Sequence, residues 1–177
     1  MPEQKQPFLE KLMRERDRFE LFLNRVGFTR RMTMTGVSGK WSVKDMLARL
    51  LISEQYIADR LNEIQQGETR TSCYTQTELD DFLTEFGYPD FGSPLLEGVT
   101  HHEWIVEKYK NASLEDLVAQ EVQAFASIVD VLEALPDSDF HKHNLSERVA
   151  DHTLKLYREH LRAIRQWLKI HAIQLKP

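Results

Sequence analysis

Four long segments of the chain carry apolar residues at the three- and four-residue spacing of an amphipathic helix. Nowhere does the sequence alternate apolar and polar residues over a length typical of a half-buried strand. A chain of this kind has to bury the apolar stripes of its helices against one another, because it offers no sheet to cover them. The segments are residues 7–26, 43–64, 114–135 and 144 to near the C-terminus.

Residues that cap helix N-termini stand at the start of three of these segments. In each case a small polar residue is followed three positions later by an acidic residue, which is a capping-box pattern. The seven glycines and six prolines of the chain lie between the long periodic stretches rather than inside them. The capping pairs are Ser42 with Asp45, Ser113 with Asp116, and Asn144 with Glu147.

The segment between the second and third long helices is irregular. Thr77 with Asp80 predicts a short helix that ends at Phe86, and residues 137–144 have the composition of a polar loop. A chain of 177 residues is long enough to form one self-sufficient core. The sequence therefore predicts a single all-α domain over residues 1–177. Its architecture would be an up-and-down four-helix bundle with an irregular, partly helical connection between the second and third long helices.

Composition excludes several classes of protein. Lysine and arginine number 23 against 28 acidic residues, and this net charge of −5 argues against a general nucleic-acid binder. No stretch approaches the length of a membrane span, and no apolar run typical of a signal peptide follows the first residues. Cys73 is the single cysteine, so an intrachain disulfide cannot form. We expect a cytoplasmic protein with no nucleic-acid or membrane partner.

The last helix contains two histidines near its apolar stripe. His152 and His160 are eight residues apart, about 12 Å along a continuous helix, which is too far for both to bind one ion directly. Leu156 occupies the position between them. The alternative to a ligand-binding role is that His160 is an interior residue whose ring nitrogens bond to neighbours.

Arg49 raises a similar choice on the second long helix. It stands among apolar residues, and a guanidinium on the inner side of a bundle would need a carboxylate or a ligand as partner. The alternative is an arginine whose stem covers apolar surface while its charge reaches solvent. Acidic residues on the helices, Glu54 and Glu159 among them, are expected to lie on solvated faces and form local ion pairs.

Three segments resemble the DinB-like four-helix bundle superfamily, in particular the branch of the colibactin self-resistance protein and the DfsB-type proteins (ClbS/DfsB). The likeness covers nearly the whole chain when the order of elements is included. The segments are Gly39–Leu50 (GKWSVKDMLARL), Glu133–Phe140 (EALPDSDF) and Leu156–Leu168 (LYREHLRAIRQWL).

The resemblance implies a crevice at the site where other members hold a divalent ion with three histidines. The matching positions here are Arg49, Leu156 and His160. Arginine cannot ligate a metal and leucine has no donor atom, so we expect no metal and no cofactor at this site. Arg49 would instead be a bidentate donor to an anionic or carbonyl-bearing ligand, with His160 as a titratable neighbour. Donors expected at the rim are Tyr56, His152 and Tyr157.

The sequence leaves several functions open, and no residue is assigned a catalytic role. The first is a metal-independent small-molecule-binding or resistance protein that hydrolyses or sequesters a reactive electrophile, as the resemblance implies. The second is a non-enzymatic helical interaction domain that forms a homodimer. In that case Arg49 would be a structural plug that pairs with an interior carboxylate. The third, a metal- and thiol-dependent transferase or hydrolase, is disfavoured by the lost ligands.

Overall fold

The protein is all-helical in the part of the chain that its computed structural model describes, which is residues 3–27, 30–68, 70–96, 102–171 and 173. These residues contain no strand, and their β-structure is limited to one isolated bridge between Ser38 and Trp41. No helix within these ranges is both long enough and apolar enough to cross a membrane. The α-helices are α1 (Lys5–Val26), α2 (Val43–Gln65), α3 (Gln76–Phe86), α4 (His102–Tyr109), α5 (Leu114–Ala134), α6 (Asp137–Lys142), α7 (Leu145–His152) and α8 (Leu154–Ile170), with 3-10 turns η1 (Arg30–Thr33) and η2 (Pro94–Leu96).

Two of the three predicted capping residues, Ser42 and Ser113, cap the helices that follow them, whereas Asn144 precedes α7 without a side-chain cap bond. Ser42 forms a complete capping box with Asp45: its hydroxyl accepts from the Asp45 amide at 3.1 Å, and the Asp45 carboxylate accepts from the Ser42 amide at 2.9 Å. Ser113 caps α5 by accepting from the Asp116 amide at 3.1 Å. These bonds satisfy amides that the first helical turn leaves without intrahelical partners.

Two shorter elements differ from the sequence prediction. The cap of α3 is Thr75, which accepts from the Glu78 amide, so the Thr77–Asp80 pair lies inside the helix. The expected polar loop over residues 137–144 contains the helix α6. Pro136 stands directly before α6, where a proline is compatible with a helix start, and buried Phe140 holds this short helix against the core.

The last predicted helix is two helices. It breaks at Thr153, whose φ of −132° and ψ of −82° lie outside the helical region. The Thr153 side chain is fully buried, and its hydroxyl donates to the Val149 carbonyl at 2.7 Å. This bond satisfies a carbonyl at the end of α7, so the interruption needs neither glycine nor proline. The axial separation predicted for His152 and His160 on a continuous helix does not apply across this break.

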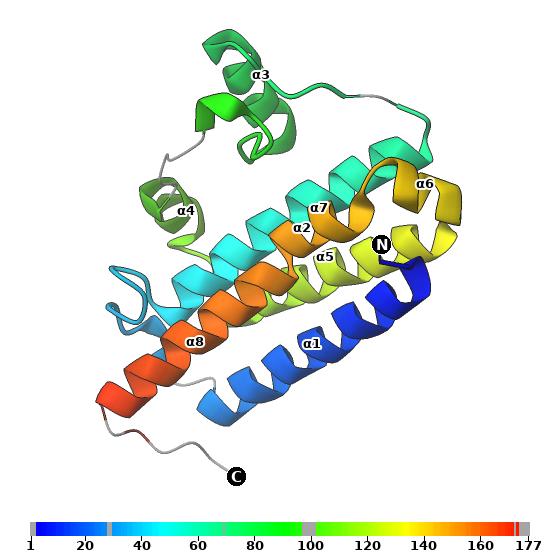
Figure 1. Cartoon of the computed structure of the whole chain (residues 1–177). Coiled ribbons are helices and arrows are strands. Elements are labelled where there is room, and N and C mark those ends of the chain that lie inside the picture. Colours follow the sequence, from blue (N-terminus) through cyan, green and yellow to red (C-terminus); the bar gives the residue numbers. More distant parts are fainter. Residues whose placement is uncertain (1–2, 28–29, 69, 97–101, 172, 174–177) are drawn as a thin grey trace.

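The helices α1, α2, α5 and α8 lie side by side, and α3 and α4 lie on the side of α2 away from α1 (Figure 1). The helix α2 packs most extensively against α5 and also contacts α4, α7 and α8. It is the most deeply buried helix, because buried side chains follow one another along Met46, Leu47, Ala48, Leu50, Leu51, Ile52, Ser53 and Glu54. Side chains on more than one face of α2 therefore point into the protein interior.

Four polar side chains, one from each long helix, meet inside the core. We call Arg16 (α1), Glu54 (α2), Glu121 (α5) and Tyr157 (α8) the buried tetrad; none is more than 6% exposed. Arg16 Nε donates to Glu121 Oε1 at 2.8 Å, and its Nη2 pairs with the other oxygen of the same carboxylate. The Tyr157 hydroxyl donates toward Glu54 at 3.5 Å.

Glu54 does not lie on a solvated face, contrary to the sequence-based expectation. Burial raises its pKa well above the ordinary value, and the adjacent Glu121 carboxylate raises it further. Two neighbouring carboxylates in the core cannot both be ionised at low cost, and Glu121 is the one paired with Arg16. Glu54 is therefore the protonated member of the pair, and its proton supplies a donor that a second carboxylate would lack.

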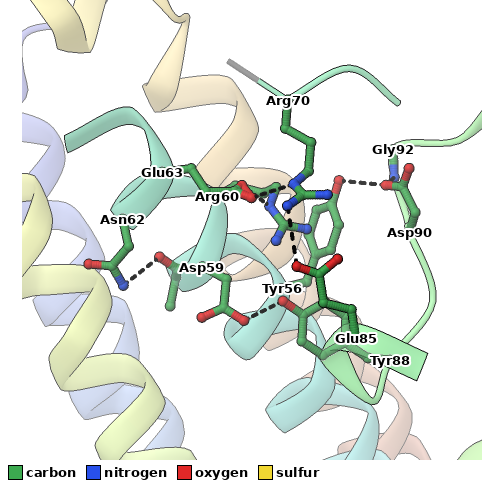
Figure 2. A network of polar contacts seen from close by, with 11 residues as sticks. Tyr56, Asp59, Arg60, Asn62, Glu63, Arg70, Glu85, Tyr88, Asp90 and Gly92 are labelled. Carbon is green, nitrogen blue, oxygen red and sulfur yellow. Dashed lines mark hydrogen bonds and ion pairs between the residues drawn. The ribbon is translucent and has the colours of Figure 1, made fainter. Parts of the chain in front are cut away.

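Residues 70–96, which include α3, form a strap over one side of α2. Arg60, which is buried, donates from Nε to Glu63 at 2.7 Å, and Arg70 of the strap donates to the other oxygen of Glu63 at 2.7 Å. The Tyr88 hydroxyl of the strap pairs with Asp59 (Figure 2). The Arg60 guanidinium also lies 4.6 Å from the Phe86 ring centroid. These contacts fix the strap to the C-terminal half of α2.

The buried tetrad predicts opposite effects for two isosteric substitutions. Glu121→Gln removes the buried ion-pair partner of Arg16 and leaves the guanidinium only its bond to the exposed Glu20, and we expect it to lower the free energy of unfolding by about 3–5 kcal/mol. Glu54→Gln replaces a protonated carboxyl by an amide that can still donate to Glu121. It should be more stable than the wild type, by a margin that grows as the pH rises from about 4.5, the ordinary value at which unfolded Glu54 ionises.

Urea denaturation of the three proteins between pH 5 and pH 8 measures both effects. An equal loss of stability in Glu54→Gln and Glu121→Gln would show that the two carboxyl groups are not in the assigned protonation states.

Candidate functional site

One face of α2 presents a row of polar side chains toward α7 and α8. Arg49, Ser53 and Tyr56 recur at four- and three-residue steps, so they lie above one another on the same side of the helix. Glu54, one position beyond Ser53 and so about 100° further around the helix, points away from the Arg49 row and joins the buried tetrad. The row and the tetrad thus lie on different faces of α2.

Two histidines face this row from the α7–α8 junction. His152 is the last residue of α7, and its Nδ1 lies 2.8 Å from the Ser53 hydroxyl oxygen. His160 lies two turns into α8 and is 6% exposed. Leu156, between them in the chain, is buried. Both rings lie near enough to Arg49 for its charge to lower their pKa values, although they stand eight residues apart.

Phe91, from the strap, covers the outer side of the row. Its ring centroid lies 5.0 Å from the Arg49 guanidinium carbon, 5.4 Å from the Tyr56 ring and 6.3 Å from the His152 ring. The Tyr56 and His152 rings are 4.9 Å apart. Arg49, Ser53, Phe91 and His152 thus form one cluster. With His160, whose pKa the nearby Arg49 charge lowers, we call this set the Arg49 site.

Two buried nitrogens of the Arg49 site lack hydrogen-bond partners within the described part of the chain. They are Arg49 Nη1 and His160 Nδ1. Most buried polar groups in proteins are hydrogen-bonded, and an unpaired one costs about 1–3 kcal/mol. Sites that bind a ligand commonly carry such unpaired groups, because the ligand supplies the missing partner.

The protonation states of the site follow from burial and from the Arg49 charge. Burial, assisted by the nearby guanidinium, lowers the pKa of His160 to about 3 and that of His152 to about 4. Both imidazoles are therefore neutral at neutral pH. Burial also lowers the pKa of Arg49, and the charge of Glu159 opposes this effect. Arginine remains charged at neutral pH, so the site carries a positive charge beside two neutral rings.

Asp90 holds Phe91 in place, and sequence analysis did not identify it. This buried carboxylate accepts from the Tyr56 hydroxyl at 3.1 Å, from the Cys73 amide at 2.8 Å and from the Gly92 amide at 3.0 Å. Its bond to Tyr56 ties the strap to α2 (Figure 2), and its bond to the Cys73 amide joins a second part of the strap to the same point. No periodic pattern marks an irregular segment of this kind, although the helical spacing from Arg49 does point to Ser53.

The five predicted ligand-binding residues do not all meet in the site. Arg49 and His152 both lie against Phe91, and His160 is near enough to Arg49 for the guanidinium charge to lower its pKa. Tyr56 contributes its ring, but its hydroxyl is bonded to Asp90 and is not a rim donor; burial and Asp90 raise its pKa to about 12. Tyr157 is 1% exposed and directs its hydroxyl to Glu54 in the buried tetrad, so it lies outside the Arg49 site.

The residues at the Arg49 site do not fit the metal that the DinB-like resemblance implies. Of the three matching positions, Arg49 and Leu156 offer no metal ligand, and only His160 could serve as one. Within the described ranges no three side chains of His, Cys, Asp or Glu come together as a metal site would require. The chemistry of the site has to be derived from the arginine, the imidazoles and the aromatic ring.

The sequence matches no protein-family model and no curated protein. The structure is similar to the crystal structure of an uncharacterised protein from Escherichia coli UTI89, with a TM-score of 0.72 and 18% sequence identity. The alignment covers 99% of this chain and 98% of that one. At this level of identity the likeness establishes a shared fold and carries no information on activity.

Gly92 allows the strap to approach Tyr56. A Cβ atom at this position would lie 2.7 Å from the Tyr56 hydroxyl, so Gly92→Ala should displace the ring and weaken its bond to Asp90. We expect a loss of about 1–3 kcal/mol in the free energy of unfolding, as for other overpacked sites. In a Tyr56→Phe background the clash is relieved, and the cost of Gly92→Ala should fall by about 1 kcal/mol. Chemical denaturation of the double-mutant cycle measures this coupling, and an equal cost in both backgrounds would contradict the close approach.

The neutral histidines predict a loss of stability in mild acid. In the unfolded chain His160 and His152 bind protons near their ordinary pKa of 6.5, whereas in the folded protein they stay neutral down to about 3 and 4. The free energy of unfolding should therefore fall as the pH decreases from 6.5 toward 4. Between pH 6.5 and pH 5 the wild type should lose about 1–2 kcal/mol more than His160→Gln, as judged from urea denaturation. Between pH 7 and pH 8 the difference between the two proteins should be constant, and a difference that does not widen in acid would contradict a depressed pKa at His160.

Proposed function

We propose that this chain is a metal-independent small-molecule-binding protein of the resistance type, built on the four-helix bundle of the DinB-like superfamily. In this proposal it binds an anionic or carbonyl-bearing ligand at Arg49. The observation that carries the proposal is the buried Arg49 Nη1, which has no hydrogen-bond partner among the described residues. A guanidinium is a fork of donors that matches a carboxylate or another oxyanion with two parallel hydrogen bonds.

The neighbours of Arg49 favour such a ligand over an internal carboxylate. His160 and His152 are neutral and can donate or accept a hydrogen bond, according to tautomer. The Ser53 hydroxyl holds one nitrogen of His152, which leaves the other nitrogen of that ring for a ligand. Phe91 supplies an apolar wall for an organic body. A site with few polar groups and apolar walls is typical of small-molecule recognition.

Sequestration of the ligand is better supported than its hydrolysis. A general base works best when its pKa lies near the operating pH. His160, at about 3, and His152, at about 4, are weak bases at neutral pH. The Arg49 charge that would attract an electrophile bearing a carbonyl oxygen also contributes to this weakness. Ligand binding therefore needs only the hydrogen bonds and the charge of these residues. Base-catalysed hydrolysis would require a histidine ring to accept a proton, which these rings do poorly.

A single substitution tests this proposal through two measurements, the free energy of unfolding and the binding of a probe ligand. Arg49→Met keeps an unbranched apolar side chain and removes the guanidinium with its unpaired Nη1. For a ligand site, the free energy of unfolding should stay within about 1 kcal/mol of the wild type or increase, because Nη1 has no hydrogen-bond partner to lose among the described residues. For a structural plug paired with a carboxylate, the same substitution should cost about 3–5 kcal/mol.

Benzoate serves as the binding probe, because it combines a carboxylate with an aromatic ring. We expect benzoate to shift the imidazole resonances of His152 and His160 in the wild type, and not in Arg49→Met. Benzamide, its neutral carbonyl analogue, should bind more weakly, and added chelator should change neither result. A destabilised Arg49→Met variant together with a wild type that does not respond to benzoate would favour the helical interaction domain instead.

A further inference from the structure

Arginines gather in a groove between α1 and α8, on the outside of the bundle. The groove has a volume of about 690 Å³, which is within the range of small-molecule sites. Its arginines are Arg18, Arg25, Arg158, Arg162 and Arg165. None of its lining residues belongs to the Arg49 site, so any ligand here would be a second one.

Helical spacing arranges these arginines in two rows. On α8, Arg158, Arg162 and Arg165 follow four- and three-residue steps and so share one face. On α1, Arg18 and Arg25 are seven residues apart, two turns along the helix. In each row the Cα atoms of the first and last arginine are therefore about 10.5 Å apart along the helix axis. The groove lies between the two rows.

The base of the groove is apolar. Phe22 and Leu161 line it, and the Arg165 guanidinium lies 5.2 Å from the Phe22 ring centroid. Leu21 at the edge is 63% exposed, which is high for a leucine in the middle of a long helix. The groove thus offers an apolar surface and guanidinium groups within one site.

Few acidic groups oppose the arginines. Among the described residues that line the groove, Glu15 is the single acid, and it pairs with Arg18 at 3.3 Å. The whole chain carries a net charge of −5, so a groove with five arginines stands out from an otherwise acidic protein. A local positive field of this kind raises the concentration of anions near the surface.

The cations lining the groove include no lysine, and this difference has a chemical meaning. Guanidinium groups bind carboxylate and phosphate groups with two parallel hydrogen bonds and also stack on rings, whereas ammonium groups act as point charges. A second copy of the chain placed symmetrically on this face would oppose arginines with arginines and be repelled. The charge therefore selects an anion rather than a copy of this protein.

From these observations we infer that the α1–α8 groove binds an organic dianion, a molecule with two acidic groups on an apolar body. The apolar body would lie on Phe22 and Leu161, and the acidic groups would each meet a guanidinium from the two rows. This site is independent of the Arg49 site and of the function proposed there.

The probe is para,para′-biphenyl dicarboxylate, a rigid apolar body with a carboxylate at each end. Isothermal titration should show saturable binding to the purified full chain. Binding of para-biphenyl monocarboxylate should be about tenfold weaker, because one charge-assisted pair is lost. Inorganic phosphate, which has no apolar body, should also bind less tightly than the dicarboxylate.

Matched substitutions locate the site. Arg162→Gln and Arg165→Gln should each weaken dicarboxylate binding about tenfold. Arg14→Gln removes the same charge from an exposed position on α1 outside the groove and should leave the affinity unchanged. All three positions are exposed on helices, so the variants should fold. Arg49→Met should also bind the dicarboxylate like the wild type, which distinguishes this inference from the proposed function.

Three results would overturn the inference. The first is the absence of saturable dicarboxylate binding to the wild type. The second is an equal loss of affinity in Arg14→Gln and Arg162→Gln, which would show that net charge alone attracts the probe. The third is loss of binding in Arg49→Met with full binding in Arg162→Gln, which would place the probe in the Arg49 site.

Discussion

The ion pair of Arg16 and Glu121 joins α1 to α5 inside the core, and the arrangement of the other long helices depends on it. Both side chains are buried, so neither can be satisfied by solvent if the helices slide or rotate. Glu54 and Tyr157 extend the contact to α2 and α8. Apolar contacts tolerate several alignments of two helices, whereas a bidentate pair has one geometry. The tetrad therefore specifies how the four helices are placed relative to one another. Their apolar stripes alone would define this placement less well.

The placement of Glu54 in the tetrad also determines the direction of other polar side chains of α2. Because Glu54 points into the tetrad, the row of Arg49, Ser53 and Tyr56 is directed toward α7 and α8. Arg49 is thereby held beneath Phe91, and its buried Nη1 has no hydrogen-bond partner among the described residues. The other faces of α2 are firmly packed, and this packing offsets the cost of the unpaired nitrogen.

The sequence predicts the long helices well because their information is local. The Ser42 and Ser113 caps and the apolar stripes that follow them act within a few residues, and the observed boundaries of α2 and α5 agree with them. The break at Thr153 carries no glycine or proline, the residues that usually mark an interruption, and so the apolar spacing alone does not reveal it. The Arg16–Glu121 pair joins residues 105 positions apart, so spacing within one helix cannot reveal it. The same holds for Phe91, whose position depends on the Asp90 contacts of an irregular segment.

The strap that carries Phe91 is attached to α2 by groups other than Phe91 itself. Asp90 bonds to a side chain of α2 and to two backbone amides, and Arg70 and Tyr88 bond to acidic residues of the same helix. The residue that covers Arg49 is thus separate from the residues that hold it there. Replacing Phe91 by a ring or chain of another shape would therefore change the cover over Arg49 and leave the bonds between the strap and α2 in place.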